Sequence, residues 1–493
     1  MRLDTINRSN YRVAIIGGGI AGMSAAYALQ EKARASGSDV SYILFESTPA
    51  LGGKIRTDET DGFVVEGGPD SFLAQKPWAA QLAQSLGLEQ DLIGTNPNQK
   101  KLFVVNHGRL EVMPDGVMLI VPTQFLPFVT SPLISWPGKL RMGMDIFIPG
   151  KKDDEDESVG SFIRRRLGSE ALDKIAAPLM SGIHVSDPDK QSLLGTFPRF
   201  HTIERQHGSL IRGMVAQRRA ARAKFAPPIR SGNHTWKNSA FVTLRGGMAQ
   251  LVQSLEKALT GDVRKNCRVV AVEKRIDAGY QIRTAGGESL DVDAVVLASP
   301  AYVSSDLVAG LAPHLSKALS AIHYVSTATV SLAFNQAEFG DPIKGVGFLV
   351  PRKENRHISA CTMSSIKFSH RAPEGQVLLR CFMGGPWHEQ DLDASDEELV
   401  ATVLAELAEL TGLQARPVLS RVYRWPKGNP QYDVGHLDKV KELHGACPPG
   451  IFLAGSAYDG VGVPDCIHQG QLVAEKVLAY LPCLAEPLSM KDA

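Results

Sequence analysis

Short apolar runs and one helical segment alternate at the start of the chain. Residues 11–16 (YRVAII) and 40–45 (VSYILF) are rich in β-branched and aromatic side chains, as buried parallel strands are. Between them lie a glycine-rich turn at 17–22 (GGGIAG) and a segment, 23–32, with the composition of a helix. The pattern predicts a βαβ unit whose second strand ends at Glu46.

Three later runs have the same strand character, at residues 268–272, 293–299 and 450–455. Helical patterns and loops separate them from the first unit and from one another. We therefore expect one domain to be assembled from three separated segments, with other domains inserted between them.

The stretch from Val117 to Gly138 is apolar and long enough to cross a membrane. However, prolines recur in it every five residues, at 122, 127, 132 and 137, and each removes a helical hydrogen bond that lipid cannot replace. We predict no transmembrane segment and expect a packed insert of loops and helices, while peripheral membrane contact stays open. Residues 1–12 have no apolar centre, so we do not expect them to form a secretory signal.

The composition is that of an ordinary globular protein with room for two or three domains. Of its 493 residues, 44% are hydrophobic and 21% charged, and the net charge is +1. This balance gives no general attraction to nucleic acid. Six cysteines without C-x-x-C or zinc spacing predict buried thiols in a reducing cytoplasm and no metal site.

The only strongly basic block runs from Arg199 to Arg245, with ten Lys or Arg and a single acid, Glu204. A solvated loop explains it as well as a surface that attracts a polycarboxylate or an anionic lipid. Nucleic acid is not expected, because no aromatic-interleaved or recognition-helix pattern accompanies the charge. By contrast, the run KKDDEDE at 151–157 precedes a helix whose C-terminal end is rich in arginine, and this charge order complements a helix dipole.

The glycine-rich turn at 17–22 is the first segment whose pattern predicts a bound ligand. Gly17-x-Gly19-x-x-Gly22 between a strand and a helix is a dinucleotide-binding fingerprint: its glycines allow the tight turn, the close approach to a pyrophosphate and the packing of helix on sheet. The helix N-terminus offers unpaired N–H groups to the phosphates. Glu46, 24 residues after Gly22, is placed to accept hydrogen bonds from a ribose.

FAD and NAD share this fingerprint, and the following residues distinguish them. Residues 51–57 (LGGKIRT) resemble the FAD loop of the flavin amine oxidase superfamily, as do 241–251 (FVTLRGGMAQL) and 452–455 (FLAG). This resemblance implies bound FAD. It also implies an α/β plus α+β fold, in which a discontinuous Rossmann-like FAD-binding domain is combined with a mixed-sheet substrate domain and a helical insert.

Further segments narrow the resemblance to the FAD-dependent porphyrinogen oxidases. They are 66–73 (EGGPDSFL), 178–184 (PLMSGIH), 196–200 (TFPRF), 424–425 with 430–432, and 460–467 (GVGVPDCI). The chain is most similar to the Gram-positive, coproporphyrin-forming type, over residues 12–481. The domains expected from this are 1–60, 240–305 and 425–493 for FAD, 61–110 and 306–424 for substrate, and a helical domain at 111–239 that could contact a membrane.

By the same resemblance, a set of residues is expected to contact FAD. They are Gly17, Gly18, Gly19, Ile20, Ala21, Gly22, Glu46, Ser47, Lys54, Gly68, Pro69, Asp70, Ser71, Val269 (through its backbone), Trp425, Val461, Gly462, Val463 and Pro464. Lys76 and Arg56 are candidates for the substrate pocket. Asp465 is either a helix-start carboxylate or a charge near the flavin. No cysteine matches a flavin-linked position, so non-covalent FAD is expected, and no general base is identified.

The resemblance implies oxygen-dependent, six-electron oxidation of coproporphyrinogen III to coproporphyrin III in haem biosynthesis, with release of hydrogen peroxide. Protoporphyrinogen IX oxidation is the alternative, followed by a flavin amine oxidase or desaturase and then by a flavin or tetrapyrrole carrier without catalysis. The expected location is the cytoplasm or the inner face of the membrane. The expected partners are a tetrapyrrole, molecular oxygen and a ferrochelatase that receives the product.

Overall fold

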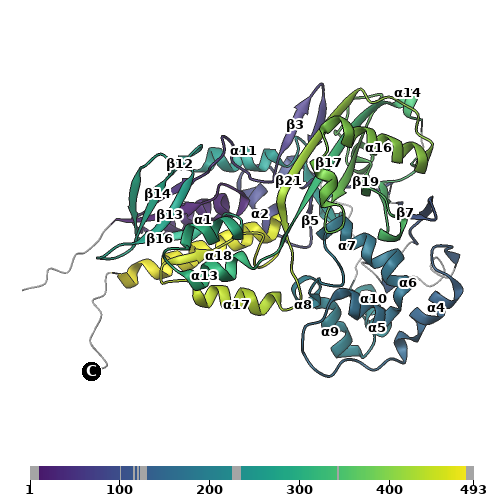
Figure 1. Cartoon of the computed structure of the whole chain (residues 1–493), viewed down its shortest axis with the longest axis horizontal. Helices are drawn as coiled ribbons and strands as arrows, with labels where there is room; N and C mark the ends of the chain where they lie inside the picture. The colour runs from purple at the N-terminus through teal and green to yellow at the C-terminus, as the bar shows by residue number, and fades with distance from the viewer. Residues whose placement is uncertain are drawn as a thin grey trace, which may run out of the picture.

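The computed structural model describes residues 10–99, 101–114, 117–118, 121–122, 130–224, 235–340 and 343–484. Two large sheets and one helical region dominate it (Figure 1). Among the described residues, none of the helices is both long enough and apolar enough to cross a membrane. The proline-spaced segment 117–138 lies partly outside the described residues; what is described includes a short β9–β10 ladder and the start of helix α4.

The first large sheet is parallel and collects strands from distant parts of the chain. Its order is β12-β2-β1-β16-β22. The strands are β1 (Tyr11–Ile16), β2 (Val40–Phe45), β12 (Asp262–Arg264), β16 (Ala294–Leu297) and β22 (Ile451–Leu453). The predicted βαβ unit is confirmed, with helix α1 (Ile20–Ser36) longer at both ends than the predicted 23–32.

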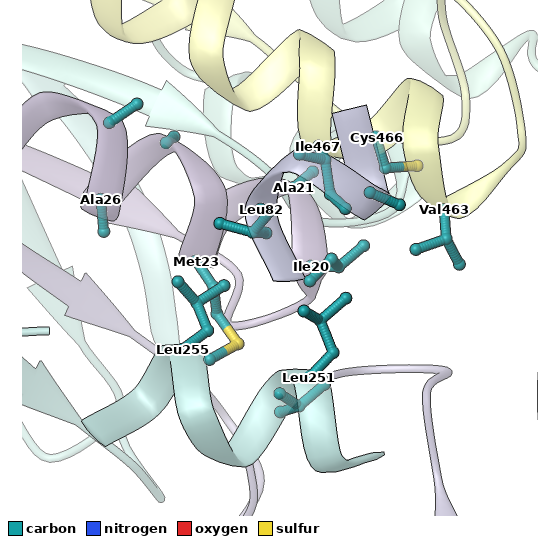
Figure 2. Packing of buried hydrophobic residues seen from close by; sticks show 14 of the residues in the cluster. Ile20, Ala21, Met23, Ala26, Leu82, Leu251, Leu255, Val463, Cys466 and Ile467 are labelled. Carbon is teal, nitrogen blue, oxygen red and sulfur yellow. The ribbon is translucent and has the colours of Figure 1, made fainter. Parts of the chain in front are cut away.

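Alternate residues of these strands face opposite sides of the sheet, as the pleat requires. Val13 and Ile15 pack with α1 and with helices α2 (Trp78–Ser85), α11 (Ala249–Ala258) and α18 (Val463–Tyr480). Figure 2 shows this layer, with Cys466 and Ile467 of α18 beside Ala21 of α1. Ala14 and Ile16 pack on the other face with helices α12 (Ala301–Val308), α13 (Pro313–Ser320) and α17 (His436–Ala446). Burial on both faces explains the continuous apolar runs.

One predicted strand lies elsewhere. The run at 268–272 becomes β13 (Val269–Lys274), which pairs with β14 (Tyr280–Thr284) in a separate antiparallel sheet. The third strand of this sheet, β15 (Ser289–Val292), pairs with the other side of β14. Only some of the β13 side chains are buried, because one face of this small sheet is exposed. The edge position in the parallel sheet belongs instead to β12, a short polar strand without an apolar signal.

The second large sheet is mixed, with order β21-β17-β20-β19-β18-β7-β8. Its pairs are antiparallel except β18 with β7. The strands are β7 (Leu102–Asn106), β8 (Arg109–Val112), β17 (Tyr324–Asn335), β18 (Gly347–Leu349), β19 (Ile358–Thr362), β20 (Gln376–Gly384) and β21 (Leu419–Pro430). Helix α16 (Asp396–Thr411) begins with a Ser395–Glu398 capping box and packs its apolar face on this sheet. The predicted fold class is therefore confirmed.

Short strands and helices join the two large sheets. A small sheet, β5-β11-β6, pairs β11 (Phe241–Leu244) with β5 (Phe72–Leu73) and β6 (Leu92–Gly94). A hairpin is formed by β3 (Thr57–Thr60) and β4 (Phe63–Glu66). The short helices α14 (Gln336–Phe339) and α15 (Ser364–Lys367) instead lie against β20 of the mixed sheet. The predicted domain boundaries stay a prediction.

The helical region lies below the mixed sheet (Figure 1). It comprises α4 (Trp136–Gly143), α5 (Val159–Leu167), α6 (Ser169–Ala171), α7 (Ala177–His184), α8 (Leu193–Thr196), α9 (Pro198–His207) and α10 (Leu210–Lys224). Ser158 caps α5 through Ser161 N, so the helix predicted from the charge order begins where the acidic run ends. Arg166 of α5 is fully buried and donates to Asp145 Oδ1 at 2.6 Å and to Gly208 O at 2.9 Å. This buried network ties α5 to the turns around it.

Candidate functional site

The glycine turn leaves the N-terminus of α1 accessible. A Cβ at Gly22 would lie 2.0 Å from Gly17 O, so this position requires glycine for packing. A Cβ at Gly19 would meet no atom within 4 Å. The first turn of α1 has no acidic residue and no side-chain cap, and among the described residues no hydrogen-bond acceptor is recorded for the amides of Ile20 and Ala21. The turn therefore offers free donors and positive potential to an anion.

Glu46 is held against this turn. Its Oε2 accepts from Gly18 N at 2.9 Å, while its Oε1 accepts from Thr48 N at 2.8 Å and more weakly from Ser47 Oγ at 3.3 Å. The carboxylate is nearly buried, with 9% exposed. One backbone link also brings the start of β13 here, because Cys267 N donates to Glu46 O at 2.8 Å. The chain just before Val269 therefore lies beside the predicted ribose acid.

The second glycine pair lies next to the first. Gly52 N donates to Gly18 O at 2.8 Å. Lys54 follows, and its Nζ donates to Gly428 O and lies 3.5 Å from Ser456 Oγ. Burial of this ammonium group lowers the pKa of Lys54. Lys54 thus connects the loop after β2 to β21 and to the loop after β22.

The segment 66–71 forms another wall of the site. A Cβ at Gly68 would lie 1.8 Å from Lys54 O, so the two predicted cofactor segments are in direct contact. Trp425 Nε1 donates to Gly67 O at 2.8 Å, which fixes the indole against the same turn. Four segments that are far apart in the sequence, at 17–22, 52–54, 67–68 and 425–428, therefore meet in one region.

Acidic groups in this wall are paired inside the fold. Asp70 receives Lys367 Nζ at 2.9 Å and lies 3.6 Å from Arg380 Nη2. Burial alone would raise the pKa of Asp70, but Lys367 and Arg380 outweigh it and hold this pKa below its usual range. Asp70 is consequently an anchor for the turn, and Pro69 and Ser71 flank it.

Glu66 lies at the end of β4 and is buried. It accepts from Thr57 Oγ1 at 2.7 Å and Met248 N at 2.8 Å, and Arg371 Nη2 lies 3.3 Å away. Burial raises the pKa of Glu66 to about 7, although Arg371 opposes the shift. These contacts join β4 to the loops before α11 and β20.

The loop at 460–462 leads into α18, and Asp465 in the first turn of this helix lies next to Lys76. Both oxygens of Asp465 lie 2.7 Å from Lys76 Nζ. Asp465 is 9% exposed, whereas the Lys76 side chain is 40% exposed. The aromatic ring of Trp78 stacks on His468 at 4.0 Å. Two helix N-termini, those of α1 and α18, lie on the same side of the packed layer (Figure 2).

The sequence allowed two interpretations of Asp465, a helix-start carboxylate or a charge near the flavin. In the structure, Asp465 forms an ion pair with Lys76. No local signal could have paired these residues, which are 389 positions apart. The anchoring cations Lys367 and Arg380 were missed for the same reason.

Arg56 lies apart from this pair. Its recorded side-chain contacts, among the described residues, are Asp58 Oδ1 at 3.4 Å and the ring of Tyr423, and the side chain is 61% exposed. The basic block is also divided. Arg199 and Arg205 lie on α9, where they bind Gln217 and Asp154, whereas Arg245 follows β11 and contacts His370. Of these three arginines, two therefore lie in the helical region and one lies beside the small sheet β5-β11-β6.

Comparison with known proteins defines the class. The chain matches the family of flavin containing amine oxidoreductases over residues 20–478. It therefore belongs to this family and is an FAD-dependent oxidoreductase. The open N-terminus of α1, the clear space at Gly19 and the buried acid at Glu46 fit a dinucleotide with a pyrophosphate and a ribose.

Two individual relatives and one solved structure show which members of the family the chain is similar to. The chain is 37% identical to the coproporphyrinogen III oxidase of Bacillus subtilis, over 95% of this chain and 98% of that protein. It is 30% identical to a chloroplastic protoporphyrinogen oxidase 1 of Spinacia oleracea, over 95% of this chain and 84% of that protein. A crystal structure of a putative protoporphyrinogen oxidase from Exiguobacterium is similar with a TM-score of 0.84 at 32% identity, covering 95% of this chain and 99% of that one.

Proposed function

We propose that this protein oxidises coproporphyrinogen III to coproporphyrin III in haem biosynthesis. The observation that carries the proposal is the 37% identity to the Bacillus subtilis coproporphyrinogen III oxidase over nearly the full length of both chains. The spinach protoporphyrinogen oxidase is more distant, at 30% identity. The FAD-binding geometry supports redox chemistry with either substrate.

The reaction removes six hydrogens from the macrocycle in three two-electron steps. With oxygen as the terminal acceptor, three O₂ are consumed and three H₂O₂ are released for each porphyrin. When bound, FAD supplies the two-electron acceptor in each step.

The chain's own residues supply position and charge. Lys54, Gly68 and Trp425 hold the three loops that surround the cofactor region, and the Lys76–Asp465 pair fixes the first turn of α18. Lys76 is the partly exposed cation of this region and is suited to a carboxylate of the substrate. The porphyrin product has the chemistry that an iron-inserting ferrochelatase consumes, and we propose transfer to such an enzyme.

Substrate preference is the direct test. We expect kcat/KM for coproporphyrinogen III to exceed that for protoporphyrinogen IX by at least about tenfold, a difference of about 1.4 kcal/mol. Porphyrin fluorescence and oxygen uptake would be followed in parallel, with putrescine as a control for amine oxidation. Equal or faster turnover of protoporphyrinogen IX would identify protoporphyrinogen IX as the substrate instead. If FAD-loaded protein turned over neither compound, porphyrinogen oxidation would be rejected as the function.

We also propose that the helical region contacts a membrane surface. Trp136, Leu140, Met144 and Phe147 are spaced along α4 and the turn after it, and they are 65%, 72%, 53% and 81% exposed. Lys139 Nζ lies 4.6 Å from the Trp136 ring, which places a cation beside the apolar side chains. An apolar helix face with tryptophan and a neighbouring lysine is typical of a helix that lies in the lipid interface.

The double variant W136A/F147A tests this contact. Each large side chain contributes about 1.5–3 kcal/mol when buried in lipid, so we expect at least about tenfold weaker partitioning to vesicles of mixed phosphatidylcholine and phosphatidylglycerol. Ile276→Ala is the matched control, because Ile276 is fully exposed on a hairpin outside the helical region. Vesicle cosedimentation that is equal for all three proteins, or absent in the unsubstituted one, would contradict membrane contact.

A further inference from the structure

Two loops at one end of the mixed sheet bring two histidines to one carboxylate. His357 immediately precedes β19, while His388 and Asp391 lie in the segment after β20, around the 3₁₀ helix Glu389–Asp393. Asp391 Oδ2 lies 2.7 Å from His357 Nδ1 and 3.4 Å from His388 Nδ1. The three candidate ligand atoms lie within 4.8 Å of one another, and no other group of this kind occurs in the described part of the chain.

We propose that His357, His388 and Asp391 bind a divalent transition-metal ion of the Zn²⁺ type. Two imidazole nitrogens and one carboxylate oxygen form a ligand set that suits Zn²⁺, Ni²⁺ or Cu²⁺, whereas Mg²⁺ and Ca²⁺ prefer oxygen alone. Tetrahedral Zn²⁺ with bonds of about 2.0–2.1 Å places its ligands about 3.4 Å apart. The 3.4 Å between Asp391 Oδ2 and His388 Nδ1 already has that value, whereas the 2.7 Å to His357 Nδ1 has to lengthen.

The exposure of the group leaves room for an ion and a fourth ligand. The His357 side chain is 52% exposed, that of His388 24% and that of Asp391 15%. An ion can therefore enter from solvent, and water can complete a four-coordinate site.

The backbone around the ligands is already fixed. His357 N donates to Glu406 Oε1 at 2.8 Å, and Asp391 N donates to His388 O at 3.2 Å. Because the main chain is held in place, binding costs mainly the ordering of three side chains.

The ion would join two loops of the sheet whose proposed ligands are 31 residues or more apart in the sequence. Between the two proposed ligands of the second loop lies Glu389, whose Oε1 accepts from Ser326 N at 2.7 Å at the start of β17. Ser326 also bonds to β21: Lys427 N, two residues after Trp425 in that strand, donates to Ser326 Oγ at 3.0 Å. Metal binding would therefore hold the loop 388–391 in place, and this loop supports the adjacent ends of β17 and β21.

The test uses untagged, FAD-loaded protein stripped with a chelator and titrated with ZnCl₂ by calorimetry. We expect one Zn²⁺ per chain, and Co²⁺ in its place should give the visible absorption of a four-coordinate ion. His357→Ala and His388→Ala should each weaken binding by more than about 100-fold, the upper range for loss of a merely supporting group. Circular dichroism confirms that each variant is folded, and exposed His357 is the variant least coupled to folding.

His444→Ala is the matched control. His444 is a surface histidine paired with a single aspartate, Asp459, at 3.6 Å, and its removal should leave Zn²⁺ binding unchanged. Equal Zn²⁺ affinity in both folded ligand variants, or no Zn²⁺ binding by the unsubstituted protein, would overturn the site. MgCl₂ should produce no binding heat, and competition by Mg²⁺ would also overturn the assignment.

Discussion

Gly19→Ala is expected to yield a folded protein that no longer retains FAD. The φ and ψ angles of Gly19, −70° and 174°, are accessible to alanine, and the added Cβ meets no protein atom within 4 Å. That Cβ instead occupies the space beside the free amides of α1, where the backbone must approach a pyrophosphate. We expect FAD affinity to fall by at least about 100-fold, or about 2.8 kcal/mol, as measured by calorimetry on the apoprotein.

Substitutions at two other glycines serve as controls that distinguish loss of FAD binding from structural damage. Gly22→Ala should unfold the protein or destabilise it by more than about 4 kcal/mol, because its Cβ would lie 2.0 Å from Gly17 O. Gly310→Ala, at an exposed position with no atom within 4 Å, should change neither stability nor FAD affinity. A Gly19→Ala protein with unchanged FAD affinity would show that the diphosphate does not lie at this turn.

Lys76→Ala is expected to lower kcat/KM for the porphyrinogen by about 100-fold, or about 2.8 kcal/mol, while FAD stays bound. The substitution leaves the nearly buried Asp465 carboxylate, in the first turn of α18, without its cation. Removal of a positioned charge at a reacting centre commonly costs about 10²–10³ in rate. It also removes the cation that we expect to face a substrate carboxylate.

A conservative substitution and a double variant with Asp465 test the role of Lys76. Lys76→Arg should recover part of the rate, and Asp465→Asn combined with Lys76→Ala should cost less than the sum of the single changes, because the two residues act as a pair. Flavin absorbance reports cofactor occupancy, and separate kcat and KM values distinguish substrate binding from the redox step. Wild-type kinetics in Lys76→Ala would remove this residue from the site.

The local part of the site could be predicted from sequence. The strand, the glycine turn, helix α1 and Glu46 are consecutive, and the backbone geometry of a few residues determines how they are placed. The parallel strands β16 and β22 were recognisable because burial on both faces demands continuous apolar runs. The FAD loop at 51–57 was likewise a contiguous signal, and it indicated the family.

The sequence by itself thus determined the fold class and the cofactor, and it predicted which residues line the glycine turn. Only the tertiary structure decided which distant side chains meet: Lys76 with Asp465, Asp70 with Lys367, and His357 with His388. It also placed the polar strand β12 at the edge of the parallel sheet, put β13 in another sheet, and separated Arg245 from Arg199 and Arg205. The reason is physical: short-range patterns record hydrogen bonding and burial of neighbours, whereas contacts across hundreds of residues depend on where chain crossovers bring each loop.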